Sequence, residues 1–233
     1  MLNIIKGKKV IFFDMGWTLD TPASGDWMIT KRAMELIGPE KLKRMSLGGM
    51  LAPGISASRC LEEHHLTTLE EECALFTRYY TLLSEDHDLG LTHEQAADIA
   101  NDRTYNMDNY VFFPDAKATV EALSKTHRLG LISDTWPSIR GQLEKGGITE
   151  YFSGFTFSCE LGVWKPDPLM YLDALQKLEV NACDAVFIDD NLNNLIGAEK
   201  LGITPIHMAA GPGGAQRTPY FTIHSPGDLL KND

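Results

Sequence analysis

Short, mainly apolar runs recur along the chain. Those at residues 10–13, 129–132 and 185–188 are wholly apolar, and each stops at a polar residue. A fourth run lies at 204–208 and a weaker one at 155–157. Runs of this length without polar alternation are typical of strands that are buried on both faces of a parallel sheet. Because helical patterns lie between them, the sequence predicts an α/β fold with a doubly wound parallel sheet, similar to a Rossmann fold.

Residues 20–109 interrupt this alternation and contain no convincing strand pattern. Capping boxes at Thr68 with Glu71 and at Thr92 with Gln95 predict the starts of two helices. An apolar stripe at helical spacing follows the first of them. We therefore expect residues 1–19 and 110–233 to form the α/β core, and residues 20–109 to form an inserted helical domain.

Two further signals predict helix ends in the second half of the chain. Asp167 followed by Pro168 indicates an N-cap and a first-turn proline, with Leu172 and Leu175 facing inward. Gly202 follows a helical pattern that begins near Leu192, and glycine is favoured just after a helix. These signals predict helices that connect the later strands.

Charge and composition limit the partners that we expect. The 233 residues carry a formal net charge of −11, which would repel a duplex or an anionic membrane. The four cysteines form no CxxC pair and no cluster with zinc spacing, as expected of reduced thiols in a cytoplasmic protein. No stretch is long and apolar enough for a transmembrane helix, so we expect neither nucleic acid nor membrane as a partner.

Polar side chains stand where the predicted strands end. Asp14 follows the first strand, Ser133 ends the second, and the pair Asp189 and Asp190 ends a later one, while Lys165 follows the weaker run. Ligands of open α/β sheets bind at the carboxyl ends of the strands. We therefore expect acidic, hydroxyl and cationic groups to meet at one edge of the sheet.

Such a set suits metal-assisted phosphoryl transfer. Paired carboxylates bind Mg²⁺, which prefers oxygen ligands, and a carboxylate can also be the nucleophile. A hydroxyl and a lysine can neutralise the charge that develops on the phosphoryl oxygens. Each residue alone has an ordinary structural interpretation, since an aspartate or serine after a strand is often a turn former or a helix cap.

The four segments resemble the four motifs of the haloacid dehalogenase superfamily. They read FFDMGWTLD, LISDT, GVWKPDP and VFIDDNLNNLIGAEKLG, and the resemblance covers residues 10–19 and 110–233. The resemblance implies a Rossmann-like core with a helical cap inserted after the first motif. It also implies a hydrolase that uses an aspartate nucleophile.

The resemblance implies a metal site built from carboxylates and a backbone carbonyl. Asp14 would be both nucleophile and Mg²⁺ ligand, and Gly16 would offer its backbone carbonyl. Asp190 would be the second carboxylate ligand. Asp189 would either bind the metal directly or support the residues that do.

The resemblance also implies a phosphate site. Ser133 would bind the phosphoryl group together with backbone N–H groups in the turn that begins at Asp134. Lys165 would balance the charge between Asp14 and that group. The expected partner is a small phosphorylated metabolite.

One position departs from the family pattern. Most phosphatases of the superfamily carry an aspartate two residues after the nucleophile, which acts as general acid and then as general base, and here that residue is Gly16. General acid–base help contributes ~10²–10⁴ in rate. Either a histidine of the insertion (His64, His65, His87 or His93) replaces it, although exposed histidines are common on helices, or the substrate has a good leaving group.

Several functions therefore stay open. A Mg²⁺-dependent phosphatase with an aspartyl-phosphate intermediate on Asp14 is favoured. A 2-haloacid dehalogenase would use the same nucleophile without a metal, which leaves the pair Asp189 and Asp190 unexplained, and a phosphonate hydrolase would need a lysine in the insertion. A phosphate-binding regulatory protein that has lost turnover is the non-enzymatic alternative, and Gly16 is its main support.

The glycine-rich segment 211–214 is not a phosphate-binding loop. It reads Gly-Pro-Gly-Gly and lacks the Lys-Ser/Thr that follows a phosphate loop. We therefore interpret it as a flexible surface loop.

Overall fold

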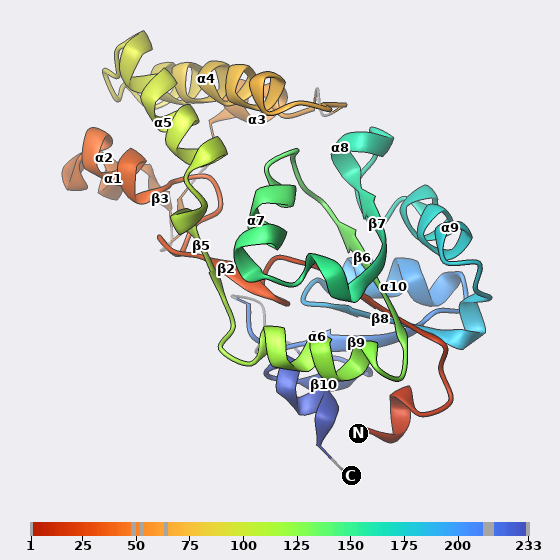
Figure 1. The fold of residues 1–233 in the computed structure, drawn as a ribbon. Coiled ribbons are helices and arrows are strands. Elements are labelled where there is room, and N and C mark those ends of the chain that lie inside the picture. Colours follow the sequence, from red (N-terminus) through yellow and green to blue (C-terminus); the bar gives the residue numbers. More distant parts are fainter. Residues whose placement is uncertain (1, 48–49, 52–53, 63–64, 212–216, 232–233) are drawn as a thin grey trace. The chain divides into compact units, whose positions relative to one another are not determined.

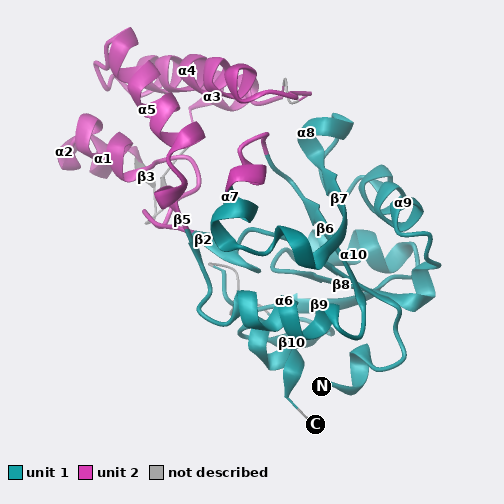
Figure 2. Ribbon diagram, in the orientation of Figure 1, with its two compact units in different colours: residues 1–21, 111–135, 142–233 teal, residues 22–110, 136–141 magenta. Residues whose placement is uncertain are grey.

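The protein consists of two compact units, coloured separately in Figure 2. The computed structural model describes residues 2–47, 50–51, 54–62, 65–211 and 217–231. The first unit, called here the core unit, comprises Met1–Thr21, Val111–Thr135 and Gln142–Asp233, and the second, the helical unit, comprises Pro22–Tyr110 and Trp136–Gly141. The chain therefore enters the helical unit twice.

The core unit is built on a six-stranded sheet in the order β10-β9-β8-β1-β6-β7 (Figure 1). The strands are β1 (Val10–Phe13), β6 (Arg128–Ser133), β7 (Phe152–Phe157), β8 (Ala185–Asp189), β9 (Thr204–Met208) and β10 (Phe221–Ile223). Every neighbouring pair is parallel. The predicted α/β fold class with a parallel sheet is thus confirmed.

The register of the sheet aligns the ends of its central strands. Phe13, the last residue of β1, pairs with Leu131 on one side and with Ile188 on the other. Asp14 directly follows Phe13, and Asp189 directly follows Ile188. The two aspartates therefore lie at the same level of neighbouring strands. All four residues of β1 are buried, which is why the strand is uniformly apolar.

Helices cover both faces of this sheet, as Figure 1 shows for α6 (Ala116–Ser124) on one face and α9 (Pro168–Lys177) and α10 (Leu192–Lys200) on the other. One apolar cluster joins Val10 and Phe12 of β1 to Tyr171 and Leu175 of α9. Since side chains alternate along a strand, the side chains of Ile11 and Phe13 face the other layer. The remaining elements of this unit are η1 (Asn3–Ile5), η3 (Thr149–Tyr151), α8 (Ser158–Leu161), η4 (Ala182–Asp184) and η5 (Pro226–Leu230), while α7 (Ile139–Gly146) spans the division between the units.

The predicted helix ends in this unit agree with the structure, whereas the predicted orientation of one side chain does not. Asp167 caps α9 by accepting a hydrogen bond from the Leu169 N–H, and Pro168 begins the helix. Gly202 follows α10 with a φ of 90°. The expectation that Leu172 faces inward is wrong: 50% of it is exposed. Apolar residues occur on every side of α9, so spacing alone did not identify the buried side.

The helical unit is formed by five helices of the described chain. They are α1 (Lys31–Ile37), α2 (Pro39–Met45), α3 (Ile55–Cys60), α4 (Leu69–Asp86) and α5 (His93–Tyr105). Both capping boxes are present, at the starts of α4 and α5. Phe76, Tyr79 and Tyr80 of α4 are buried and form edge-to-face and tilted ring pairs that build the centre of this unit.

The region expected to lack strands contains three short ones. β3 (Ser46–Leu47) and β4 (Met50–Leu51) pair antiparallel. β2 (Asp20–Pro22) pairs with β5 (Tyr110–Phe112), where the chain passes between the two units, and η2 (Met107–Asn109) precedes β5. Strands of two or three residues are too short to leave a pattern of alternation, so the sequence did not predict them.

Candidate active site

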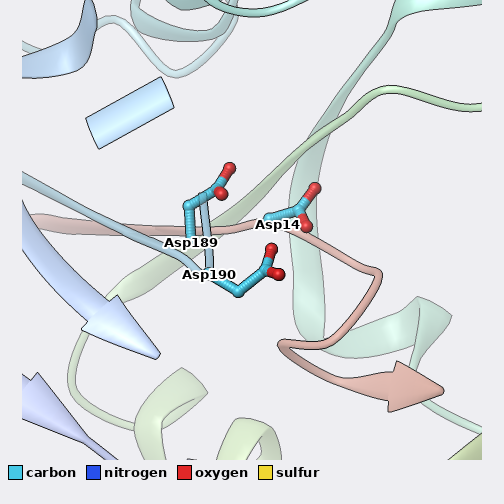
Figure 3. Close-up of side chains that lie close together, drawn as sticks. All are labelled: Asp14, Asp189 and Asp190. Carbon is cyan, nitrogen blue, oxygen red and sulfur yellow. The ribbon is translucent and has the colours of Figure 1, made fainter. Parts of the chain in front are cut away.

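The carboxyl ends of β1 and β8 bring three carboxylates together (Figure 3). Asp14 follows β1, Asp189 ends β8, and Asp190 comes next in the chain. Each offers an oxygen atom, and these atoms all lie within 4.8 Å of one another. Carboxylate oxygens at such distances can bind one divalent cation.

Lys165 lies against two of these carboxylates. Its Nζ donates hydrogen bonds to Oδ1 of Asp14 over 2.6 Å and to Oδ2 of Asp189 over 2.8 Å. A third hydrogen bond, over 3.2 Å, goes to the backbone carbonyl of Ile132. The Lys165 side chain is 1% exposed, so it is a buried cation between two buried anions.

The loop that carries Lys165 is itself fixed. The backbone N–H of Lys165 donates to Oδ1 of Asp134 over 2.8 Å, which joins this loop to the end of β6. Two residues later Asp167 caps α9. The GVWKPDP segment thus has two structural roles: it places Lys165 next to Asp134, and its Asp167 begins helix α9.

Asp189 accepts three hydrogen bonds from two residues besides Lys165. Its Oδ1 accepts from the Asn191 N–H over 2.7 Å, and the Asn194 side chain donates to both oxygens, over 3.3 and 3.0 Å. Tyr171 fixes Asn194 by donating to its carbonyl over 2.8 Å. Both oxygens of Asp189 therefore accept hydrogen bonds, and the side chain is fully buried.

The electrostatics of the cluster show an excess of negative charge. Three carboxylates face one ammonium group, so two negative charges would remain unbalanced with all three carboxylates ionised. Burial raises the pKa of Asp14 well above its usual value, and Asp189 and Asp190 raise it further against the lowering effect of Lys165. Burial and then Asp189 raise the pKa of Asp190 to about 7.

Burial and the neighbouring carboxylates also shift the pKa of Lys165. Burial disfavours its ammonium form, but Asp14 and Asp189 together favour that form more strongly and raise the pKa of Lys165 well above its usual value. The two carboxylates therefore favour the charged form of Lys165 in this site. A divalent cation would supply the two positive charges that the cluster still needs.

The turn after Asp14 contains Gly16 and Trp17, whose backbone has an unusual conformation. Trp17 has a φ of 55°, which is uncommon for a bulky residue, and its N–H donates to the Asp20 carbonyl over 2.7 Å. Gly16 forms an isolated bridge with Asp20. Gly16 has no side chain, so this position, two residues after Asp14, offers no proton donor.

Ser133, the last residue of β6, is 2% exposed. The chain that follows is fixed in the core unit: Asp134 accepts from the Lys165 N–H, and the Thr135 N–H donates to the Ser158 hydroxyl over 2.8 Å. The Ser133 hydroxyl therefore lies at the end of β6, and a hydroxyl can donate a hydrogen bond to an anion.

Gly211 is a residue of the site that sequence reasoning missed. A Cβ atom at this position would lie 2.7 Å from Oδ2 of Asp190 and 3.1 Å from Cβ of Trp17. A side chain at this position would therefore displace the Asp190 carboxylate, and glycine allows the loop to lie close to it. The segment was interpreted only as a surface loop, and its residues 212–214 lie outside the described part of the chain.

The histidines considered as replacements for the missing acid have varied surroundings. His65 and His93 are exposed and His87 is partly exposed, whereas His64 lies outside the described residues. Their role as acids stays a hypothesis.

Comparison with known proteins identifies the class. The clustered aspartates and the buried lysine lie at the carboxyl edge of a parallel α/β sheet, where ligands bind in such folds. A family model described as haloacid dehalogenase-like hydrolase matches residues 54–202, more than half of the chain. The chain therefore belongs to the haloacid dehalogenase-like hydrolase family.

Individual relatives are more distant. The glyceraldehyde 3-phosphate phosphatase of Methanopyrus kandleri is 32% identical over 91 residues, which are 36% of this chain and 39% of the relative. The phosphoserine phosphatase of Thermus thermophilus is 28% identical over 141 residues, 58% of this chain and 55% of the relative. The chain thus spans about half or less of the length of these curated relatives.

Solved structures share the fold. The HAD-hydrolase YfnB from Bacillus subtilis, bound to magnesium, has a TM-score of 0.69 at 15% identity, and the match covers 97% of this chain and 98% of that one. At this level of identity the likeness shows the fold alone. Among the described residues, no helix is both long and apolar enough to cross a membrane.

Proposed function

We propose that the chain is a Mg²⁺-dependent phosphatase that acts on a small phosphorylated metabolite. The observation that carries this proposal is the charge balance of the cluster, where three carboxylates face a single buried ammonium. The remaining two negative charges suit one divalent cation with oxygen ligands. The phosphatases among the curated relatives support a phosphate ester as substrate.

The ligands that would bind Mg²⁺ are Asp14, Asp190 and the carbonyl of Gly16. Asp189 has a different role in this proposal, because each of its oxygens already accepts hydrogen bonds from Lys165, Asn191 or Asn194. It holds Lys165 in place beside Asp14. When bound, Mg²⁺ would neutralise negative charge on the carboxylates and on the phosphoryl oxygens.

The chemical step begins at Asp14. Lys165 donates a hydrogen bond to Oδ1 of Asp14, so Oδ2 of Asp14 attacks phosphorus. The bond between phosphorus and the oxygen of the leaving group breaks as the new bond forms. Lys165 and the Ser133 hydroxyl balance the charge on the phosphoryl oxygens. Water then attacks the phosphorus of the acyl phosphate, which releases phosphate and restores the Asp14 carboxylate.

The leaving group determines which substrates react well. Gly16 has no proton to donate, so the leaving oxygen departs as an anion and takes its proton from solvent. An acyl, aryl or sugar-1-phosphate, whose leaving group is stable as an anion, is therefore the favoured substrate class. The net charge of −11 disfavours long polyanions.

The test is a screen of small phosphate esters with Mg²⁺ or with a chelator. We expect hydrolysis that needs Mg²⁺ and is lost in Asp14→Asn. Asp184→Asn is the matched control, because Asp184 lies in the core unit and its carboxylate pairs with the exposed Lys9. Absence of Mg²⁺-dependent hydrolysis for every ester would refute the proposal, and metal-independent release of halide from a 2-haloacid would favour a dehalogenase.

A further inference from the structure

Glu72 is a buried carboxylate in the helical unit. It lies in the first turn of α4 beside Glu70 and Glu71, which are exposed, whereas Glu72 itself is 0% exposed. A buried carboxylate needs close partners, because burial of an unpaired charge is costly. The partners of Glu72 therefore indicate what this side chain holds in place.

Three hydrogen bonds from two residues satisfy Glu72. Arg103 of α5 donates from Nη1 to Oε1 over 3.0 Å. Ser138 donates twice, from its backbone N–H to Oε2 over 2.7 Å and from its hydroxyl to Oε1 over 2.8 Å. Most of the hydrogen bonding of Glu72 thus fixes one residue of the segment Trp136–Gly141.

A second contact from α4 fixes the same segment. Phe76 lies one turn after Glu72, and its ring meets that of Trp136 edge to face with the centroids 5.2 Å apart. The Arg103 guanidinium covers the Phe76 ring, 3.6 Å from its centroid. Helix α4 therefore holds both Trp136 and Ser138, through an aromatic contact and a charged one.

This segment continues directly from the proposed phosphate site. Ser133 ends β6, and the next two residues are held within the core unit by the Lys165 backbone and the Ser158 hydroxyl. Residues Trp136–Gly141 belong to the helical unit, and the chain returns to the core unit at Gln142. The stretch from Ser133 to Ser138 is thus anchored at both of its ends.

We infer that Glu72 is a positioning residue for phosphate binding: through Ser138 it sets the conformation of the chain that carries Ser133. The inference rests on the proposed phosphatase function. Glu72 touches no substrate in this account, yet it contributes to affinity and rate. A misplacement of binding groups by about 1 Å costs about a hundred-fold in rate.

The test compares two buried serines that both contribute a hydroxyl hydrogen bond. Ser138→Ala removes the hydroxyl that binds Glu72. Ser84→Ala is the matched control, because Ser84 lies on α4, is buried, and its hydroxyl accepts from the Leu91 N–H over 2.9 Å. Inhibition by inorganic phosphate, kcat and KM for a phosphate ester, and the unfolding midpoint are measured for each variant.

We expect Ser138→Ala to weaken inhibition by inorganic phosphate by about ten-fold or more and to lower kcat, as the loss of preorganised donors requires. Ser84→Ala should lower the unfolding midpoint to a similar degree while leaving both kinetic readouts within about two-fold of the wild type. Equal kinetic effects in the two variants, or none in Ser138→Ala, would overturn the inference and leave the phosphatase function intact.

A second variant keeps the test independent of any single substitution. Glu72→Gln combined with Ser138→Ala should affect phosphate inhibition no more than Glu72→Gln alone, because both act through one contact. Additive effects would contradict the inference. If the wild-type protein neither hydrolyses phosphate esters nor binds inorganic phosphate with Mg²⁺, then the proposed function fails, and this inference fails with it.

Discussion

The side-chain nitrogen of Lys165 lies 2.6 Å from Oδ1 of Asp14, although 151 residues separate the two in the chain. The same nitrogen binds Asp189, so one cation joins the ends of β1 and β8. Without it, three carboxylates would share a small buried volume. Lys165 therefore serves both the stability of this sheet edge and the proposed chemistry.

Replacing Lys165 separates these two contributions. Lys165→Met should lower the free energy of unfolding by about 3–5 kcal/mol, since it leaves buried carboxylates without their cation. Added Mg²⁺ should then raise the unfolding midpoint of this variant more than that of the wild type. Chemical denaturation with and without Mg²⁺ measures both effects, and a variant as stable as the wild type without Mg²⁺ would contradict the charge balance.

Gly16→Asp tests the explanation offered for the missing general acid. An aspartate here could protonate the leaving oxygen, which helps most when that oxygen is a poor leaving group. We expect hydrolysis of alkyl phosphates to rise by about ten-fold or more and that of aryl phosphates to change little. No gain for alkyl phosphates would indicate that another residue already acts as the acid.

Gly211→Ala tests the close approach of that loop to Asp190. The added methyl group would lie 2.7 Å from Oδ2 of Asp190, so the carboxylate must move. We expect weaker Mg²⁺ binding in calorimetry. Gly7→Ala is the control, because Gly7 has a φ of 80° with open space around it and should lose stability alone. Unchanged Mg²⁺ affinity in Gly211→Ala would exclude Asp190 as a ligand.

Asp20 predicts a pH dependence of stability. It is fully buried, its oxygens have no hydrogen-bond partner among the described residues, and burial raises its pKa well above the usual value of 3.8. The folded state therefore binds more protons than the unfolded state, so Asp20 lowers stability as the pH rises above the unfolded value.

The variant Asp20→Asn removes this titration. Relative to the wild type it should gain up to about 1.4 kcal/mol of unfolding free energy per pH unit above about pH 4, until the folded pKa is passed. Urea unfolding at several pH values between 5 and 8 measures the difference between the two proteins. A difference that stays constant with pH would show that Asp20 is ionised in the folded protein.

Local patterns in the sequence were sufficient for much of this structure. Residues 10–13 and 185–188 are uniformly apolar because both faces of their strands are covered, and the capping box at Thr68 depends only on neighbouring residues. The clustering of Asp14 with Asp189 followed from a general property of parallel sheets, that strand ends meet at one edge.

Other features depend on contacts between distant segments and left no local signal. Glu72 stands among three consecutive glutamates, and only its contacts with Ser138 and Arg103 distinguish it from its exposed neighbours. Gly211 was interpreted as part of a surface loop because nothing nearby in the sequence indicates its approach to Asp190. Tertiary packing decided both positions.

The most direct test of the central claim is a rapid acid quench during turnover of an aryl phosphate, followed by mass spectrometry of the peptides. Aspartyl-phosphate is a covalent intermediate on the nucleophile, so the peptide with Asp14 should carry one added phosphoryl group. This group should be absent from Asp14→Asn and from wild-type protein quenched without substrate. Steady hydrolysis with no phosphoryl group on Asp14, or with the group on another residue, would contradict the assignment of Asp14 as the nucleophile.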